Sequence, residues 1–226
     1  MIEVARRSVR ELEHSPSLGN QSIQGEVQWF CEQELRHAGA HLKAMEVLEK
    51  QGAMGPELSG QIEAVGVWLL KWVPLSWNLA ISAAIENVTA ALAILILRDR
   101  VLDAVPEPML GLLKWHCEEE WEHRHVIFDL MQIYTRRSYA ARATGWFLSF
   151  AVLGVLGFWA TAHCLQVRTK NRLPRYSEMR SLFGLFVSEE GVLYKSIPYL
   201  MRYLQPAFHP LSSHELPDHP RVKKTA

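Results

Sequence analysis

The apolar and polar positions along the chain follow a helical period, and no stretch alternates as a β-strand would. Apolar residues recur every three or four positions from about Ile23 to Lys50, and Gly52 and Gly55-Pro56 end that pattern. The sequence therefore predicts an all-α protein. Further helices are predicted over residues 57–73, over 109–137, and from 177 to a break or kink at Pro198.

Two other stretches, 76–103 and 144–165, are apolar on nearly every side and are predicted to be helices buried in the core. The second spans about 22 residues and lies between Arg142 and Arg168, so it is also long enough to cross a bilayer. We favour a core or dimer-interface helix there. Membrane association through 144–165, peripheral or integral, is the alternative.

The ends of the chain have a different composition from its middle. Residues 1–20 are polar and are expected to form a flexible segment, and 211–226 an irregular tail. Nothing between them looks like a linker, so 21–210 is predicted to be a single helical domain that binds metal, for the reasons given below.

Composition narrows the class of protein. Lysine plus arginine and aspartate plus glutamate are equal at 24 each, so the charge balance predicts no nucleic-acid partner. The three cysteines form no C-x-x-C pair, and an odd number argues against a disulfide framework. The first residues lack the apolar stretch of a secretory signal, so a cytoplasmic location is expected.

One face of the first predicted helix is apolar at both ends and polar in its middle. On a helical wheel Phe30, Glu34, His37 and His41 share this face with apolar residues before and after them. Spacings of three and four stack the carboxylate and the two imidazoles on adjacent turns, facing the core.

The helix around residue 120 repeats this arrangement. His116, Glu120 and His123 interrupt an apolar stripe at the same spacings, and Glu119 lies at its edge. Trp115 and Trp121 flank these residues and are expected to form walls of the site.

Glu86 is the only acidic residue between Ser76 and Arg98, and the residues sharing its face are small. A buried carboxylate without a partner is costly, and either a metal ion or a basic side chain would offset the cost.

These three helices predict one interior metal site. Carboxylates can bridge two cations while imidazoles bind each one terminally, as in ferritin-like bundles with a Glu-x-x-His from each of two helices. We therefore expect a ferritin-like bundle with additional helices and two divalent ions, iron being favoured over zinc or manganese. Glu189 and Glu190 are weaker candidates for a fourth-helix ligand. The predicted metal ligands are Glu34, His37, His41, Glu86, His116, Glu120 and His123.

The segment Trp115-His116-Cys117-Glu118-Glu119-Glu120-Trp121-Glu122-His123, with Phe128-Asp129, resembles the signature of a bacterial family of predicted metal-dependent hydrolases. Phe30 to His41, Ile85 to Ala90 and Phe208-His209-Pro210 resemble other segments of that family. The chain departs from the family at Asn87 and Val88, where the family usually has His and Phe. The resemblance implies metal dependence and hydrolysis.

Three functions fit these patterns. The first is a metal-dependent hydrolase acting on a small molecule, with Glu119 as the general base beside the site. The second is a diiron oxidase or oxygenase whose substrate is small and apolar or lipid-like. The third is a non-catalytic site for metal storage or structure. A second copy of the chain, in a homodimer, is the other possible partner.

Overall fold

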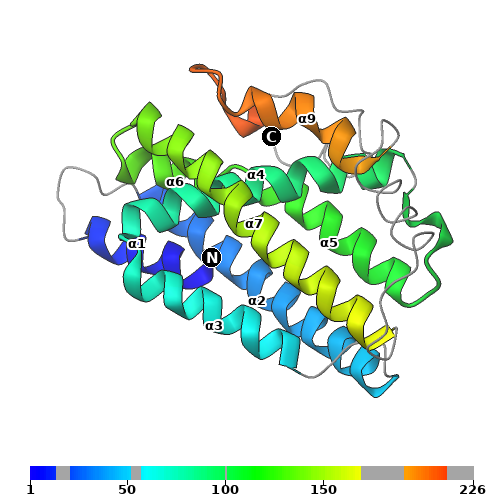
Figure 1. Cartoon of the computed structure of the whole chain (residues 1–226). Helices are drawn as coiled ribbons and strands as arrows, with labels where there is room; N and C mark the ends of the chain where they lie inside the picture. The colour runs from blue at the N-terminus through cyan, green and yellow to red at the C-terminus, as the bar shows by residue number, and fades with distance from the viewer. Residues whose placement is uncertain (14–20, 52–56, 100, 169–190, 213–226) are drawn as a thin grey trace.

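The structure, a computed structural model, describes residues 1–13, 21–51, 57–99, 101–168 and 191–212 (Figure 1). Every element in these residues is a helix, which confirms the all-α class. The α-helices are α1 (Ile2–Glu13), α2 (Gln21–Lys50), α3 (Glu57–Trp72), α4 (Leu75–Arg98), α5 (Met109–His123), α6 (Val126–Tyr134), α7 (Tyr139–Arg168) and α9 (Val192–Arg202). Two short 3-10 helices, η1 (Val101–Ala104) and η2 (Pro210–Ser212), complete them.

Helix α4 is the centre of the bundle and contacts α1, α5, α6, α7 and α9 (Figure 1). Its sequence explains this position, because a helix that is apolar on all sides is stable only where other helices surround it. In its most apolar 18-residue window, 72% of the positions are buried. The predicted core helix over 76–103 is confirmed as far as Arg98, after which the chain forms η1.

The expectation of a flexible segment over residues 1–20 is wrong for Ile2–Glu13, which form α1. This helix buries Val4, Ala5, Ser8 and Leu12 and packs against α2, α4 and α6. Its few buried residues lie at helical spacing among many charged ones, so the apolar stripe is narrow. The segment 14–20 and the tail from 213 lie outside the described residues.

The predicted helix over 109–137 is two helices, α5 and α6, separated at Arg124 and His125. The Arg124 guanidinium donates a hydrogen bond to the carbonyl of Trp121, the group that the amide of residue 125 would bond in a continuous helix. It also donates to the carbonyl of Pro210 at 3.3 Å. A contact with the distant C-terminal segment therefore accompanies the break between α5 and α6.

Helix α7 approaches α4 closely at one point and is otherwise poorly covered. A Cβ atom added at Gly145 would lie 2.6 Å from the carbonyl of Ala80, so only glycine allows this approach. In the apolar window of α7, however, only 17% of the positions are buried. The expectation of a core helix over 144–165 is thus wrong for the outward side of α7, whereas a dimer interface and membrane association stay predictions. By length and composition α4 and α7 could each cross a membrane, but α4 is a core helix here.

Candidate metal centre

The first half of the site comes from one face of α2. Phe30 and His37 are buried there, and Glu34 between them is nearly so. The edge of the Phe30 ring lies against the imidazole of His123, with ring centroids 5.0 Å apart. The apolar end of the predicted stripe therefore packs directly on the polar middle of the facing helix.

The second half comes from α5, where Glu120 is buried and His123 is fully buried. Because these residues are three apart, they project from the same side of α5 toward α2. The ring of Trp115, on the turn before, lies edge-on to His37 at 4.9 Å between centroids. Trp115 is thus a wall of the site, as the sequence predicts.

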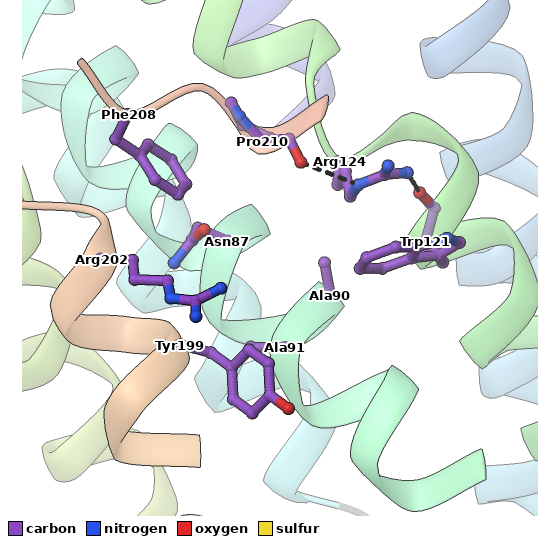
Figure 2. Close-up of a pocket in the computed structure, with 9 residues that line it drawn as sticks. All are labelled: Asn87, Ala90, Ala91, Trp121, Arg124, Tyr199, Arg202, Phe208 and Pro210. Carbon is purple, nitrogen blue, oxygen red and sulfur yellow. Dashed lines mark hydrogen bonds between the residues drawn. The ribbon is translucent and has the colours of Figure 1, made fainter. Parts of the chain in front are cut away.

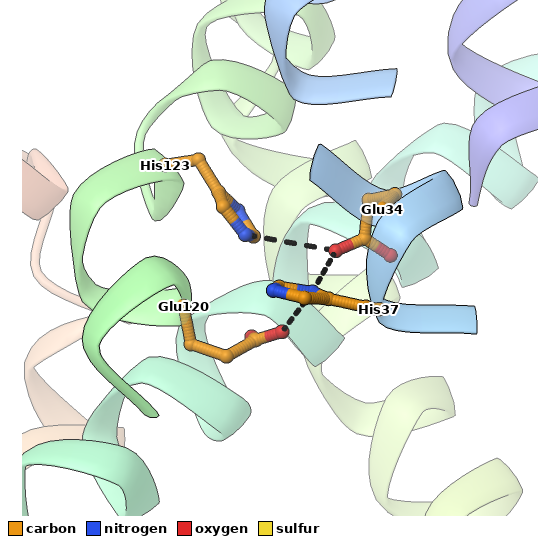
Figure 3. A group of neighbouring side chains, drawn as sticks. All are labelled: Glu34, His37, Glu120 and His123. Carbon is orange, nitrogen blue, oxygen red and sulfur yellow. Dashed lines mark hydrogen bonds and ion pairs between the residues drawn. The ribbon is translucent and has the colours of Figure 1, made fainter. Parts of the chain in front are cut away.

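Glu34, His37, Glu120 and His123 form a compact group between the two helices (Figure 3). One ligand atom from each can be chosen so that all four lie within 4.8 Å of one another. Glu34 Oε1 lies 3.2 Å from His37 Nδ1 and 3.6 Å from His123 Nε2. Glu120 Oε1 lies 3.8 Å from His37 Nδ1. Two carboxylates and two imidazoles this close can hold a divalent cation.

Glu86 reaches the other side of His123 from α4. Its carboxyl is fully buried, and Oε2 lies 3.3 Å from His123 Nδ1, the nitrogen that faces away from Glu34. Neither oxygen has a hydrogen-bond partner among the described residues. A carboxylate at the second nitrogen of a ligating imidazole is a common arrangement that fixes the orientation of the ring.

His41 and His116 extend the cluster away from the core. His41 Nε2 and His116 Nδ1 are 3.3 Å apart, and His116 Nε2 is 3.5 Å from Glu120 Oε1. Burial, with the nearby His37 and His41, lowers the pKa of His116 to about 4, so its ring is neutral at neutral pH. Its side chain is nevertheless 27% exposed, which shows that solvent reaches the site from this end.

Glu119 lies at the rim of the site, outside the group of four. Its Oε2 is 2.7 Å from His37 Nε2. Its Oε1 accepts a hydrogen bond from Gln33 Nε2 at 3.2 Å and lies 3.5 Å from the Arg36 guanidinium. Gln33, a buried polar residue on α2, is not among the predicted site residues. The only indication of its role in the sequence is its place beside Glu34.

The electrostatics of the metal-free site disfavour charge in its deepest part. Burial and the negative charge of Glu34 raise the pKa of Glu86 well above its usual value of 4.5. Burial and the charge of Glu86 raise the pKa of Glu120 to about 7, and burial lowers the pKa of His123. A divalent cation would reverse these shifts by favouring the carboxylates and the neutral imidazole.

Nearer the rim the shifts have the opposite sign. Burial would raise the pKa of Glu34, but its hydrogen bond with His37 and the nearby imidazoles outweigh this effect and lower it. Burial would likewise lower the pKa of His37, but the hydrogen bond with Glu34 and the carboxylates around it raise it. In the metal-free protein opposite charges therefore hold Glu34 and His37 together. A bound cation would replace this attraction.

The residues present fit a metal ion. Besides both oxygens of Glu86, the buried atoms without a hydrogen-bond partner among the described residues include Glu120 Oε2 and both ring nitrogens of His123. Buried polar atoms without a partner are rare in native cores and often indicate an absent ion or water. The donor set of carboxylates and imidazoles suits zinc, manganese or iron.

A small cavity of about 30 Å³ lies beside the site, between α4, α5 and the C-terminal segment (Figure 2). Asn87, Trp121 and Arg124 line it. Asn87, which departs from the family signature, therefore borders this cavity and is not one of the four clustered side chains. This volume is large enough for water-sized molecules.

A second polar group lies outside the predicted site. It brings His125 and Asp129 together with Glu26 of α2, with 3.6 Å between His125 Nε2 and Glu26 Oε2. His209 Nε2 donates to Asp129 Oδ1 at 2.8 Å and so ties the C-terminal segment to α6. Glu189 and Glu190 lie outside the described residues.

Comparison with known families identifies the class of protein. The model of the family described as "Predicted metal-dependent hydrolase" matches residues 3–214, nearly the whole chain. The chain therefore belongs to this family. The search of curated proteins finds no match. The search of solved structures also finds none, so the ferritin-like fold stays a prediction.

Proposed function

We propose that this chain is a metal-dependent hydrolase whose ions are held by Glu34, His37, Glu120 and His123. The observation that carries the proposal is the compact buried group that these side chains form, within 4.8 Å of one another, on two facing helices. The family's description supports the same chemistry, although that description is itself a prediction.

We further propose that the site is dinuclear. The group of four can hold one cation, and three further side chains border it. Glu86 contacts His123, His116 contacts Glu120, and His41 contacts His116. The cluster holds more carboxylate and imidazole donors than one four-coordinate cation needs, and a second divalent cation would use those that remain.

A bound divalent cation supplies Lewis acidity toward a carbonyl or phosphoryl oxygen and makes water a better nucleophile. The chain's own part is to position the reactants and to move protons. Glu119 is suited to accept a proton, because it lies at the rim, 2.7 Å from His37 and 14% exposed. Gln33 and Arg36 hold its other oxygen in place.

The opening beside His116 is the side from which we propose that a small substrate enters. His116 and Glu119 are the more exposed members of the cluster, whereas Glu86 and His123 are sealed. A neutral His116 can accept a hydrogen bond or ligate a metal ion at neutral pH, and either role would place it at the entrance.

The alternative is a diiron oxidase or oxygenase, and the aromatic surroundings of the site favour it. Trp29, Phe30 and Trp115 all pack edge-on against the site imidazoles, which gives a less polar wall than hydrolysis requires. Tyr134 is not part of this wall, because its hydroxyl donates to Glu11 of α1.

The hydrolase and the oxidase can be distinguished by loading the metal-free protein with zinc, manganese or ferrous iron, one metal at a time, under anaerobic conditions. We expect the zinc or manganese protein to hydrolyse simple carboxylic or phosphate esters. Replacing Glu119→Gln should lower kcat by about 10²–10⁴ without changing the metal content, as for loss of a general base. Glu122→Gln, an exposed residue on the same helix, is the control. Dioxygen uptake by the iron protein alone, with no ester hydrolysis under any metal, would favour the oxidase and sink the hydrolase.

A further inference from the structure

The outward side of α7 carries a continuous apolar stripe. Phe147, Val155 and Phe158 are 63%, 68% and 79% exposed, and Phe150 is exposed beside them. Their successive spacings of three, five and three place them along one side of the helix. No exposed position of α7 between 147 and 162 carries a charge, whereas the outward face of a helix in a soluble bundle is normally polar.

Helix α3 also carries exposed apolar side chains. It contacts α7, and its Val67, Trp68 and Trp72 are all more than half exposed. Lys71 lies over the ring of Trp72, with its ammonium 5.2 Å from the ring centroid. Tryptophan beside lysine is typical of side chains that lie at the level of lipid headgroups.

The stripe has no partner within the described part of the chain. A Cβ atom added at Gly154 or Gly157 would meet nothing within 4 Å, so these glycines do not serve a close helix contact there. Exposed apolar surface of this extent on one face usually marks a binding surface.

The charge around α7 indicates what binds. No aspartate or glutamate occurs between Leu130 and Ser177, while Arg136 and Arg137 precede α7 and Arg168 ends it. Arg136 and Arg137 are exposed immediately before α7. An apolar stripe with basic residues at its end and no acid complements an anionic lipid surface.

The inward side of α7 is fixed to the protein by polar contacts. Trp146 Nε1 donates to the carbonyl of Leu200 at 3.1 Å, and the Arg142 guanidinium donates to the carbonyl of Gln205 at 2.7 Å. Only one side of the helix is therefore free to meet lipid. Because its inward side is bound to the protein, helix α7 can bury its outward side in the membrane interface without crossing the bilayer.

We propose that the α3–α7 face, defined by Val67, Trp68, Trp72, Phe147 and Phe158, is a docking surface for an anionic bilayer. Helix α7 then lies flat in the interface with its outward stripe among the acyl chains. The basic residues before it contact the headgroups. This inference does not depend on the reaction performed at the metal centre.

Flotation of the purified full-length chain with vesicles tests the proposal. We expect the wild type to float with vesicles of equal parts phosphatidylcholine and phosphatidylglycerol. The double variant Phe147→Glu/Phe158→Glu should partition at least tenfold less. The matched control Leu42→Glu/Val47→Glu makes the same change at two exposed positions of α2 and should float like the wild type. Helical content by circular dichroism must be equal in all three.

The basic residues are tested separately. Arg136→Asn/Arg137→Asn suits the left-handed backbone at both positions and should weaken binding to the mixed vesicles by about tenfold or more. Binding to phosphatidylcholine alone should not change.

Three results would overturn the proposal. One is absence of flotation with either vesicle. Another is a lipid-free dimer that Phe147→Glu/Phe158→Glu dissociates, because the stripe would then meet a second copy. The third is protection of one end of α7 from trypsin added to vesicle-bound protein, because a flat helix leaves Arg136 and Arg168 on the same side.

Discussion

Replacing Glu86→Gln tests whether this buried carboxyl is retained for the sake of a bound cation. Glu86 is fully buried, and neither of its oxygens has a hydrogen-bond partner in the described part of the chain. Burial and the charge of Glu34 raise its pKa well above 4.5. The metal-free native chain therefore holds a proton on Glu86 more strongly than the unfolded chain does.

The sign and size of the effect follow from this difference in bound protons. Because the native state binds more protons, the free energy of unfolding falls as pH rises from 4.5 toward the raised pKa. The loss is about 1.4 kcal/mol for each pH unit between the usual and the raised pKa. Glutamine carries no such proton. The metal-free variant should therefore be more stable than the wild type at pH 7, and this advantage should shrink as the pH is lowered to 4.5.

Urea denaturation followed by circular dichroism, in chelator at pH 4.5 and 7, measures this difference. Adding zinc, manganese or ferrous iron at about 100 times its Kd should then stabilise the wild type by about 2.7 kcal/mol, and should stabilise the variant much less. Glu122→Gln, exposed on α5, should match the wild type throughout. A metal-free variant less stable than the wild type at pH 7, or equal stabilisation of both by metal, would refute the reasoning.

Two further predictions concern packing and thiol chemistry. Gly145→Ala should lower the free energy of unfolding by about 1–3 kcal/mol, because its Cβ would meet the backbone of Ala80, whereas Gly154→Ala should raise it by about 0.5–1 kcal/mol in open space. Urea titration of both variants checks this, and similar changes in the two would contradict the close approach. Burial raises the pKa of the Cys31 thiol, and that of Cys117 to about 11, so iodoacetamide at pH 8 should modify both far more slowly in the native than in the denatured chain. Mass spectrometry of the cysteine-containing peptides measures the rates, and equal rates would show that the core around these thiols is open.

The sequence predicts the two halves of the metal centre because each depends on helical period alone. Spacings of three and four place Glu34 beside His37 and Glu120 beside His123 whatever the tertiary structure. The inward direction of these faces also follows from the apolar residues around them. Glu86 is predicted for a similar reason, because a single acid in a long apolar helix has no solvated side to occupy.

Features that depend on distant contacts are not visible in the same pattern. The break after α5 accompanies the bonds of Arg124 to Trp121 and to Pro210, the second of which is 86 residues away. His125, which lies at this break, is half-buried and contacts Glu26 of α2. The exposure of α7 is also invisible in the sequence, because the same apolar composition suits a core helix and a membrane surface.

Helix α1 differs from the prediction for another reason. Its buried face consists of a few small or aliphatic residues such as Val4, Ser8 and Leu12, at intervals of four. The sequence contains this helical period, but the charged residues around it favour a solvated segment. Packing against α2 and α4 stabilises the helix even though its apolar stripe is narrow.

Metal content is the measurement that tests the central claim most directly. The chain, purified without oxygen and dialysed against each metal in turn, should retain one to two ions of its preferred metal. The variant Glu34→Ala/Glu120→Ala should retain none. The matched control Glu32→Ala/Glu122→Ala removes an exposed acid from each of the same two helices and should bind like the wild type. Full occupancy in Glu34→Ala/Glu120→Ala, with a folded chain, would contradict the account.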